Sequence, residues 1–124
     1  MGKPGHTGIS RLLHATRFSL RGIAFAWRHE RAFRQELMLT AALMPVALWL
    51  GRGPQERLLL IGSCLLVLIV ELLNSAVEAA VDRVGHEHHE LSGRAKDMGS
   101  AAVMLSLLLL AACWATVIYE RFLA

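Results

Sequence analysis

Long apolar blocks, rather than short alternating ones, dominate the hydrophobic pattern of this chain. They cover residues 37–50, 58–81 and 98–119, and the last block contains no charged residue. A helix needs about 20 apolar residues to cross the hydrocarbon core of a bilayer, so the two later blocks are long enough. The first block reaches that length only if Ala32 and Phe33 are included. The pattern predicts transmembrane helices at about residues 31–51, 58–82 and 98–119.

The segment at about residues 6–30 has the periodicity of an amphipathic helix. At 100° per residue its large apolar side chains share one arc, and most of its basic side chains lie opposite. The apolar set is Ile9, Leu12, Leu13, Leu20, Ile23 and Trp27, and the basic set is Arg11, His14, Arg17, Arg21 and Arg28. Basic amphipathic helices lie in the membrane interface, so we predict a surface helix here.

The polar connections between the blocks predict the orientation in the membrane. We expect a tight turn at residues 51–57 and a longer polar loop at residues 83–97. Residues 1–36 hold seven Lys or Arg and the 83–97 loop holds three, against three elsewhere in the chain. Because positive charge accumulates in cytoplasmic segments, the N-terminus and the 83–97 loop are predicted to be cytoplasmic.

Composition supports the same class of protein. The chain has 124 residues, a single-domain length, and 55% of them are hydrophobic. Its net charge of +3 suggests anionic lipid rather than nucleic acid, because no aromatic residues alternate with the basic ones. Cys64 and Cys113 lie inside apolar runs and form no metal motif. The start is polar, so we expect the spans to insert as uncleaved helices.

Within the second block, the run ELLNSAVEAAVD carries an unexpected set of polar residues. On a helix, Glu71, Asn74, Glu78 and Asp82 fall within an arc of about 80°. We call these four residues the polar stripe. A carboxylate at the bilayer centre costs about 2.5–3.5 kcal/mol or more, whereas interhelical hydrogen bonds average less than about 2 kcal/mol. Helix packing is one explanation of the stripe. A functional site is favoured, because burying four polar residues costs more free energy than their hydrogen bonds between helices would return.

The expected depth of each stripe residue suggests its chemistry. Asp82 should lie at the cytoplasmic headgroups and Glu71 deepest, where a carboxyl group can act as a general base or carry a proton. A carboxylate nearer the surface can bind Mg²⁺, and Glu30 could join Glu78 in such a site. Alternatively, Glu30 is a solvated charge or an ion-pair partner. Lys96 can contact phosphate oxygens or simply anchor the cytoplasmic side.

Other motifs are weak or missing from the sequence. The histidines of the run HEHH do not have the HExxH zinc spacing, so a zinc site is not expected. Neither a Walker GxxxxGK[ST] motif nor the HRD and DFG motifs of protein kinases occur. The sequence also lacks the GxSxG motif of many hydrolases. Any nucleotide would therefore be handled by a different architecture.

Two long runs resemble the signature of the prokaryotic diacylglycerol kinases, which are small integral-membrane lipid kinases. They are ELLNSAVEAAVDR at residues 71–83 and HELSGRAKDMGSAAV at residues 89–103. The run ERAFRQE at residues 30–36 and the pattern Ser19-x-Arg21-Gly22 are also similar. The resemblance extends from about Ile9 to Val117. It implies an all-α membrane protein with a surface helix and three transmembrane helices, assembled as a homotrimer with active sites shared between subunits.

The resemblance also implies a role for individual residues. Glu71 matches the general base and Asn74 a residue that orients the centre, while Glu30 and Glu78 match the Mg²⁺ ligands. Positions that match nucleotide contacts are Arg11, Gly85, Glu87, Lys96 and Asp97, and positions that match the lipid pocket are Glu36 and Ser100. Phe18 stands where the family often has Tyr, so a hydroxyl contact to nucleotide is not expected there.

The implied reaction is transfer of the γ-phosphate of MgATP to the primary hydroxyl of diacylglycerol, giving phosphatidic acid at the cytoplasmic face of the inner membrane. Three alternatives remain open at this point. A relative of the same family could instead phosphorylate undecaprenol. The buried carboxyl groups could serve a small proton-coupled transporter. The stripe could also belong to a structural subunit in which it specifies only helix packing.

Overall fold

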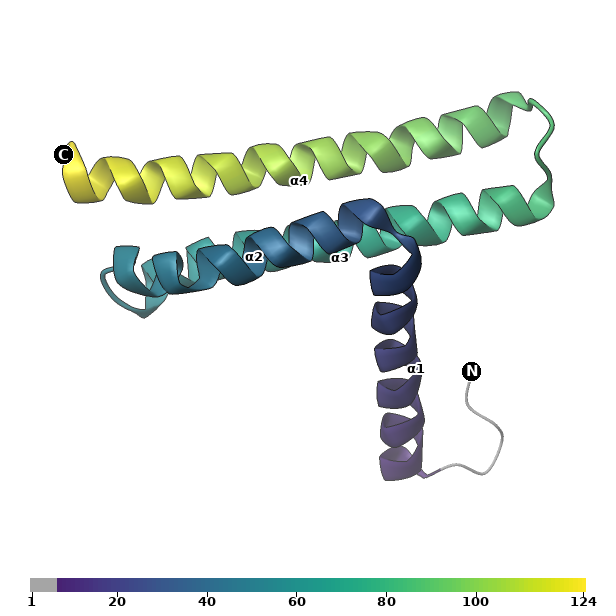
Figure 1. Ribbon diagram of the computed structural model, residues 1–124, viewed down its shortest axis with the longest axis horizontal. Coiled ribbons are helices and arrows are strands. Elements are labelled where there is room, and N and C mark those ends of the chain that lie inside the picture. Colours follow the sequence, from purple (N-terminus) through teal and green to yellow (C-terminus); the bar gives the residue numbers. More distant parts are fainter. Residues whose placement is uncertain (1–6) are drawn as a thin grey trace.

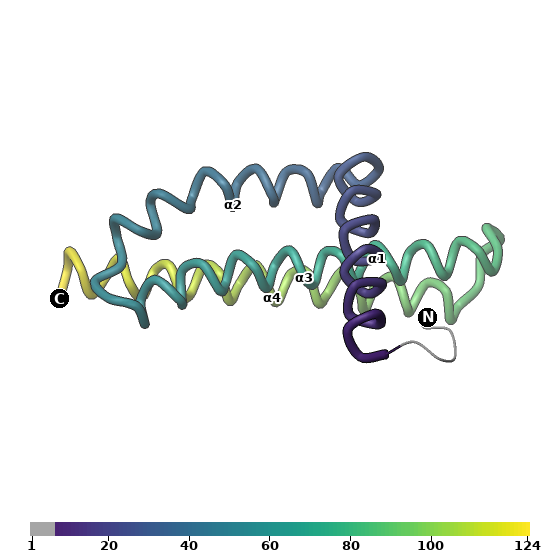
Figure 2. Tube along the Cα trace, turned by 90° about the horizontal axis from the view of Figure 1, so that it is seen from below, coloured from purple at the N-terminus to yellow at the C-terminus, as the bar shows by residue number. Residues whose placement is uncertain are grey.

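Four α-helices make up the described residues, 7–124, of the chain, as the computed structural model shows (Figure 1). They are α1 (Gly8–His29), α2 (Arg31–Leu50), α3 (Pro54–Val84) and α4 (Glu90–Phe122). In both views α2, α3 and α4 run along one direction and α1 crosses it (Figures 1 and 2). The all-α prediction is confirmed for this part of the chain. The predicted start of the surface helix, near residue 6, lies outside the described residues.

The corner between α1 and α2 is held by one arginine. Glu30 has extended backbone angles, φ −112° and ψ 106°, which end α1 and let the chain turn. The Arg34 guanidinium then donates to the carbonyls of Trp27 at 2.9 Å and Arg28 at 3.1 Å. The last carbonyls of a helix have no partner inside it, and positive charge is favoured there. Arg34 therefore helps to fix where α1 joins the bundle.

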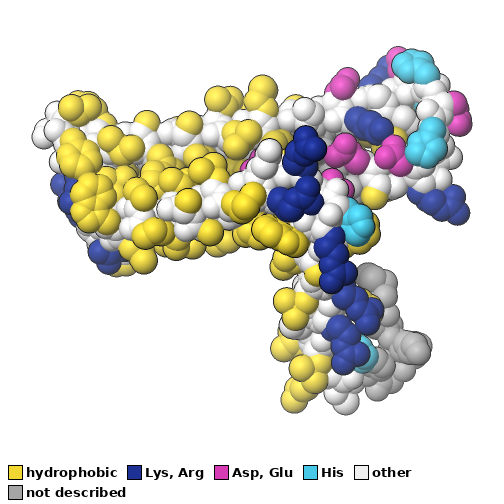
Figure 3. Space-filling view, in the orientation of Figure 1, with side chains coloured by type: hydrophobic (Ala, Val, Ile, Leu, Met, Phe, Trp, Pro, Cys, Tyr) yellow, Lys and Arg dark blue, Asp and Glu magenta, His cyan; other side chains and the backbone are white. Residues whose placement is uncertain are grey.

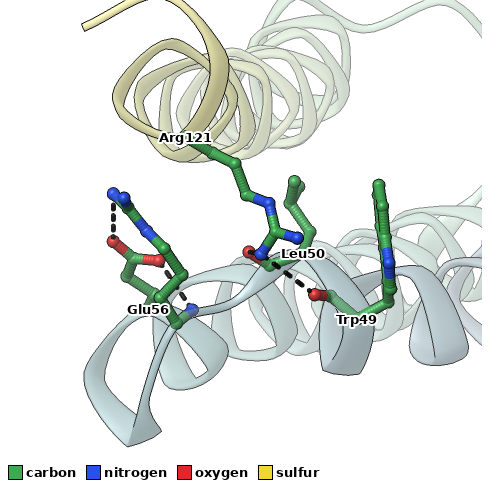
Figure 4. Close-up of polar contacts among 5 residues, drawn as sticks. Trp49, Leu50, Glu56 and Arg121 are labelled. Carbon is green, nitrogen blue, oxygen red and sulfur yellow. Dashed lines mark hydrogen bonds and ion pairs between the residues drawn. The ribbon is translucent and has the colours of Figure 1, made fainter.

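At the opposite end of the bundle, arginines stabilise the C-terminus of α2. Arg121 of α4 donates to the carbonyls of Trp49 at 3.3 Å and Leu50 at 3.1 Å, and its guanidinium lies 4.9 Å from the Trp49 ring centroid (Figure 4). Arg57 donates to the Leu48 carbonyl at 3.2 Å. Gly53, with φ 123°, makes the turn into α3 in a conformation that favours glycine.

Little of the apolar surface is buried inside the chain. One core cluster lies at the end of the bundle where Arg121 contacts α2 and contains Ala47, Leu50, Leu60 and Val117. The other lies where α1 meets the bundle and contains Ala26, Phe33 and Leu68. Many large apolar side chains of α3 and α4 remain exposed, among them Leu65, Ile69, Leu73, Leu105 and Leu108. Apolar exposure on this scale marks a surface that contacts lipid or other protein.

The lengths and surface of the helices divide the molecule into an apolar body and a polar head. α3 has 31 residues and α4 has 33, about 46 and 50 Å at 1.5 Å per residue, against about 30 Å of hydrocarbon. Both helices continue past α1, and acidic and histidine side chains gather on that projecting part (Figure 3). We call this part, residues 78–97, the polar head.

Two described helices, α3 and α4, are long and apolar enough to cross a membrane. α2 has 20 residues, but Arg34, Gln35 and Glu36 lie near its start, and it does not meet the same criterion. That α2 also crosses the membrane stays a prediction.

The predicted loop at residues 83–97 is wrong in extent. α3 continues to Val84 and α4 begins at Glu90, so the connection is only residues 85–89. His89 caps α4 by accepting the Leu91 N–H on its Nδ1 at 3.1 Å, and Glu90 pairs with Arg94 one turn later. The turn at residues 51–57 is likewise shorter, because α3 begins at Pro54. The apolar blocks predicted only the apolar part of each helix. The backbone hydrogen bonds of α3 and α4 continue into the polar residues on either side of the connection.

Candidate active site

The polar stripe runs along α3 from the body to the polar head, and its exposure to solvent increases in that order. Glu71 is 5% exposed, Asn74 is half-buried, and Glu78 and Asp82 are exposed. The Asn74 side-chain Nδ2 donates to Oε1 of Glu78 at 3.3 Å. A single helix face thus carries acidic groups from a buried position to an open one.

Glu36 of α2 brings a second acid to the deep end of the stripe. Its carboxyl group lies beside that of Glu71, across the α2–α3 interface. Glu36 Oε2 and Asn74 Oδ1 are buried and accept no hydrogen bond from the described residues. Buried polar atoms without a partner are rare in proteins, so each calls for an explanation. Glu36 was predicted at the lipid pocket; here it directly adjoins the predicted base.

The outer end of the stripe borders a polar cavity of about 220 Å³ in the head. Its lining includes Asp82, Gly85, Glu87 and Lys96, together with the histidines of the connection, His86, His88 and His89. The Lys96 ammonium donates to Asp82 Oδ1 at 2.9 Å, which links α4 to α3. Asp82, the stripe residue with the least obvious role in the sequence, therefore holds the lysine at the cavity.

Three of the predicted nucleotide-contact residues thus come together, and two do not. Gly85, Glu87 and Lys96 line the polar cavity, whereas Asp97 is exposed on α4 outside it. Arg11 is in the first turns of α1 and does not line the cavity either. Ser100, predicted at the lipid pocket, is exposed on α4.

A second cavity, of about 430 Å³, lies between α1 and α3 and is mainly apolar. Glu30 and Phe25 line it from the α1 side, and its floor on α3 is built from small side chains, Ser75, Ala76 and Ala79. These α3 residues were not singled out from the sequence. Their signal was the spacing of small residues on one helix face, beside the polar stripe.

The described residues contain no cluster of three His, Cys, Asp or Glu side chains arranged for a metal ion. Mg²⁺ does not need one, because it is usually held by one or two carboxylates with substrate phosphates and water. Glu78 fits this role, since its carboxylate is exposed and oriented by Asn74. Glu30 is half-buried in the α1–α3 cavity, and no contact joins it to Glu78 within the described chain.

Comparison with known proteins identifies the family. The profile of the prokaryotic diacylglycerol kinases matches residues 17–118. The chain belongs to the prokaryotic diacylglycerol kinase family. Diacylglycerol kinase of Pseudomonas aeruginosa is 54% identical over 114 residues, covering 92% of this chain and 93% of that protein. Diacylglycerol kinase of Escherichia coli (strain K12) is 47% identical over 116 residues, covering 94% and 95%.

A more distant relative shows the same full-length correspondence. Diacylglycerol kinase of Helicobacter pylori (strain 26695) is 41% identical over 120 residues, covering 97% of this chain and 90% of that protein. Membership in the prokaryotic diacylglycerol kinase family confirms the resemblance and the prediction that the chain is an enzyme. With α3 and α4, it identifies a membrane protein. The roles of individual site residues stay predictions.

Proposed function

We propose that the chain transfers the γ-phosphate of MgATP to the primary hydroxyl of diacylglycerol and so forms phosphatidic acid. The observation that carries this proposal is the polar stripe, which connects a buried acid in the apolar body to a polar cavity in the head. A lipid alcohol and a nucleotide require environments of these two kinds. The relatives named Diacylglycerol kinase support the choice of lipid.

Phosphoryl transfer depends mainly on positioning and on neutralising charge. Glu71 is the group we expect to accept the hydroxyl proton as the lipid oxygen bonds to the γ-phosphorus and the bond to the departing ADP breaks. It is buried at the lipid level of the stripe. Lys96, held by Asp82 at the polar cavity, would bind phosphate oxygens of ATP. Glu30 and Glu78 would hold Mg²⁺, which supplies further positive charge at the phosphates when bound.

The apolar cavity between α1 and α3 suits the lipid chains. It opens beside the small α3 residues that flank the stripe, and α1 is apolar on one side and basic on the other. The apolar side chains of α1 are largely exposed, as expected of a helix that lies in the interface. In this arrangement α1 covers the lipid and holds anionic headgroups near the site.

We further propose that the enzyme lies in the inner membrane as a homotrimer, with the N-terminus and the polar head in the cytoplasm. Support for shared sites comes from Glu30 and Arg11, which lie on or beside α1, away from the polar cavity that Lys96 lines. A neighbouring subunit would complete the site. Exposed apolar faces of α3 and α4 provide surface for such contacts.

The decisive test is a kinase assay on the purified protein in micelles or bicelles, with labelled ATP, Mg²⁺ and diacylglycerol. We expect labelled phosphatidic acid, and its absence from a folded preparation would refute the proposal. Parallel reactions with undecaprenol separate the two lipid substrates: preferential labelling of the polyprenol would reassign the substrate. Proton or solute transport by proteoliposomes without ATP would instead favour a transporter.

A further inference from the structure

Gly99 of α4 faces the polar stripe where the two long helices pack together. A Cβ added to Gly99 would collide with Oδ1 of Asn74 and would lie 3.3 Å from its Cγ. The helical glycines Gly22, Gly62 and Gly93 differ, because a Cβ at any of them would meet nothing within 4 Å. Glycine costs a helix interior about 1 kcal/mol relative to alanine, so a glycine in this place needs a reason.

The orientation of the Asn74 amide follows from its two neighbours. Its Nδ2 donates to Glu78, and a carboxylate can only accept hydrogen bonds. The amide oxygen must therefore point the other way, toward Gly99, where it is buried without a hydrogen-bond partner among the described residues. The space left by the missing side chain of Gly99 is what admits this oxygen.

We propose that Gly99 is a positioning residue, which acts on the catalytic centre by admitting the Asn74 amide and so aiming its Nδ2 at Glu78. The role in catalysis rests on the proposed function, in which Glu78 holds Mg²⁺. The contact itself does not rest on it. With alanine at position 99, the Asn74 side chain collides with the new Cβ. The short side chain then changes rotamer, which turns its Nδ2 away from Glu78 and removes their hydrogen bond.

The test compares Gly99→Ala with Gly62→Ala as a matched control. Both replace a helical glycine by alanine, but only the first meets a neighbouring side chain. We expect Gly99→Ala to raise the Mg²⁺ concentration for half-maximal activity by about tenfold or more, the equivalent of one hydrogen bond to a charged group. Gly62→Ala should leave it unchanged. An unchanged Mg²⁺ requirement in an active Gly99→Ala enzyme would overturn the proposal.

A second readout does not depend on activity. Asn74 is the only asparagine in the chain, so nitrogen-15 labelling of asparagine gives one side-chain NH₂ signal in the NMR spectrum, a pair of peaks at a single nitrogen frequency. We expect Gly99→Ala and Glu78→Gln each to shift that signal, and Gly62→Ala to leave it in place. A signal that does not move in Gly99→Ala would refute the contact, whatever the kinase assay shows.

The double variant separates positioning from simple helix packing. If Gly99 acts through Asn74, Gly99→Ala should change the Mg²⁺ requirement no further once Asn74 is alanine. The same additional loss in both backgrounds would overturn the proposal, because it would mean that Gly99 acts through the helix interface alone. A wild-type protein that is inactive on diacylglycerol would count against the proposed function, and the NMR comparison would still decide the contact.

Discussion

Arg121 offers a sharp test of how the end of the bundle opposite the polar head is held together. Its guanidinium donates to the carbonyls of Trp49 and Leu50 and lies over the Trp49 ring (Figure 4). Two such hydrogen bonds contribute about 1 kcal/mol each and the cation–π contact about 0.5–1 kcal/mol. We therefore expect Arg121→Met, which keeps the apolar stem, to lower the free energy of unfolding by about 2–3 kcal/mol.

Denaturant titration in mixed micelles, followed by circular dichroism or tryptophan fluorescence, measures this change. Arg121→Lys should lie between methionine and wild type, because lysine keeps the charge but loses the planar guanidinium that lies over the Trp49 ring. Arg52→Met is the control: Arg52 pairs with Glu56 at 3.4 Å in an exposed position, and exposed pairs contribute little. If Arg121→Met and Arg52→Met were equally mild, the proposed stabilisation of α2 by α4 would be wrong.

Four further changes test the site and the turn. Glu71→Gln should reduce kcat by about 10²–10⁴-fold with the fold intact. The control is Glu120→Gln, on the exposed side of α4, which should keep wild-type activity. Wild-type activity in Glu71→Gln would exclude Glu71 as the base. Glu78→Gln should raise the Mg²⁺ requirement, and an unchanged metal titration would remove it from the ligands. Lys96→Met should raise KM for ATP more than for lipid; a selective effect on lipid would contradict its placement. Gly53→Ala should lower stability by about 1 kcal/mol in the same denaturant titration, since alanine disfavours its φ, and a neutral result would contradict that turn.

The helices were predictable because lipid contact and amphipathic packing both leave periodic patterns. The pattern at residues 6–30 and the apolar blocks gave four helices in the right order. The ends were less predictable, because residues 90–97 are polar and yet continue α4, supported by a cap and an ion pair. The contacts of Arg121 with α2 were not predictable, because Arg121 is separated from its two partners by 71 and 72 positions in the sequence.

For the site, the angular spacing of the polar stripe was sufficient to place Glu71, Asn74 and Glu78 on one face. The sequence could not show what Asp82 contacts, because its partner Lys96 comes from the next helix. Nor could it single out Gly99, because the role of a glycine at a helix contact depends on which atom of the other helix occupies the space beside it. Such complementary contacts are decided by packing between helices, and no periodicity records them.

The projection of α3 and α4 beyond α1 has a consequence for how two incompatible reactants meet. Glu71 and Asp82 are 11 residues apart, about 16 Å along one continuous helix. Under the proposed reaction, the water-soluble nucleotide binds outside the hydrocarbon core of the bilayer, and the lipid reacts without leaving its leaflet. The single helix α3 would then cross the boundary between water and lipid and hold both binding regions. No separate step would be needed to carry either reactant to the other.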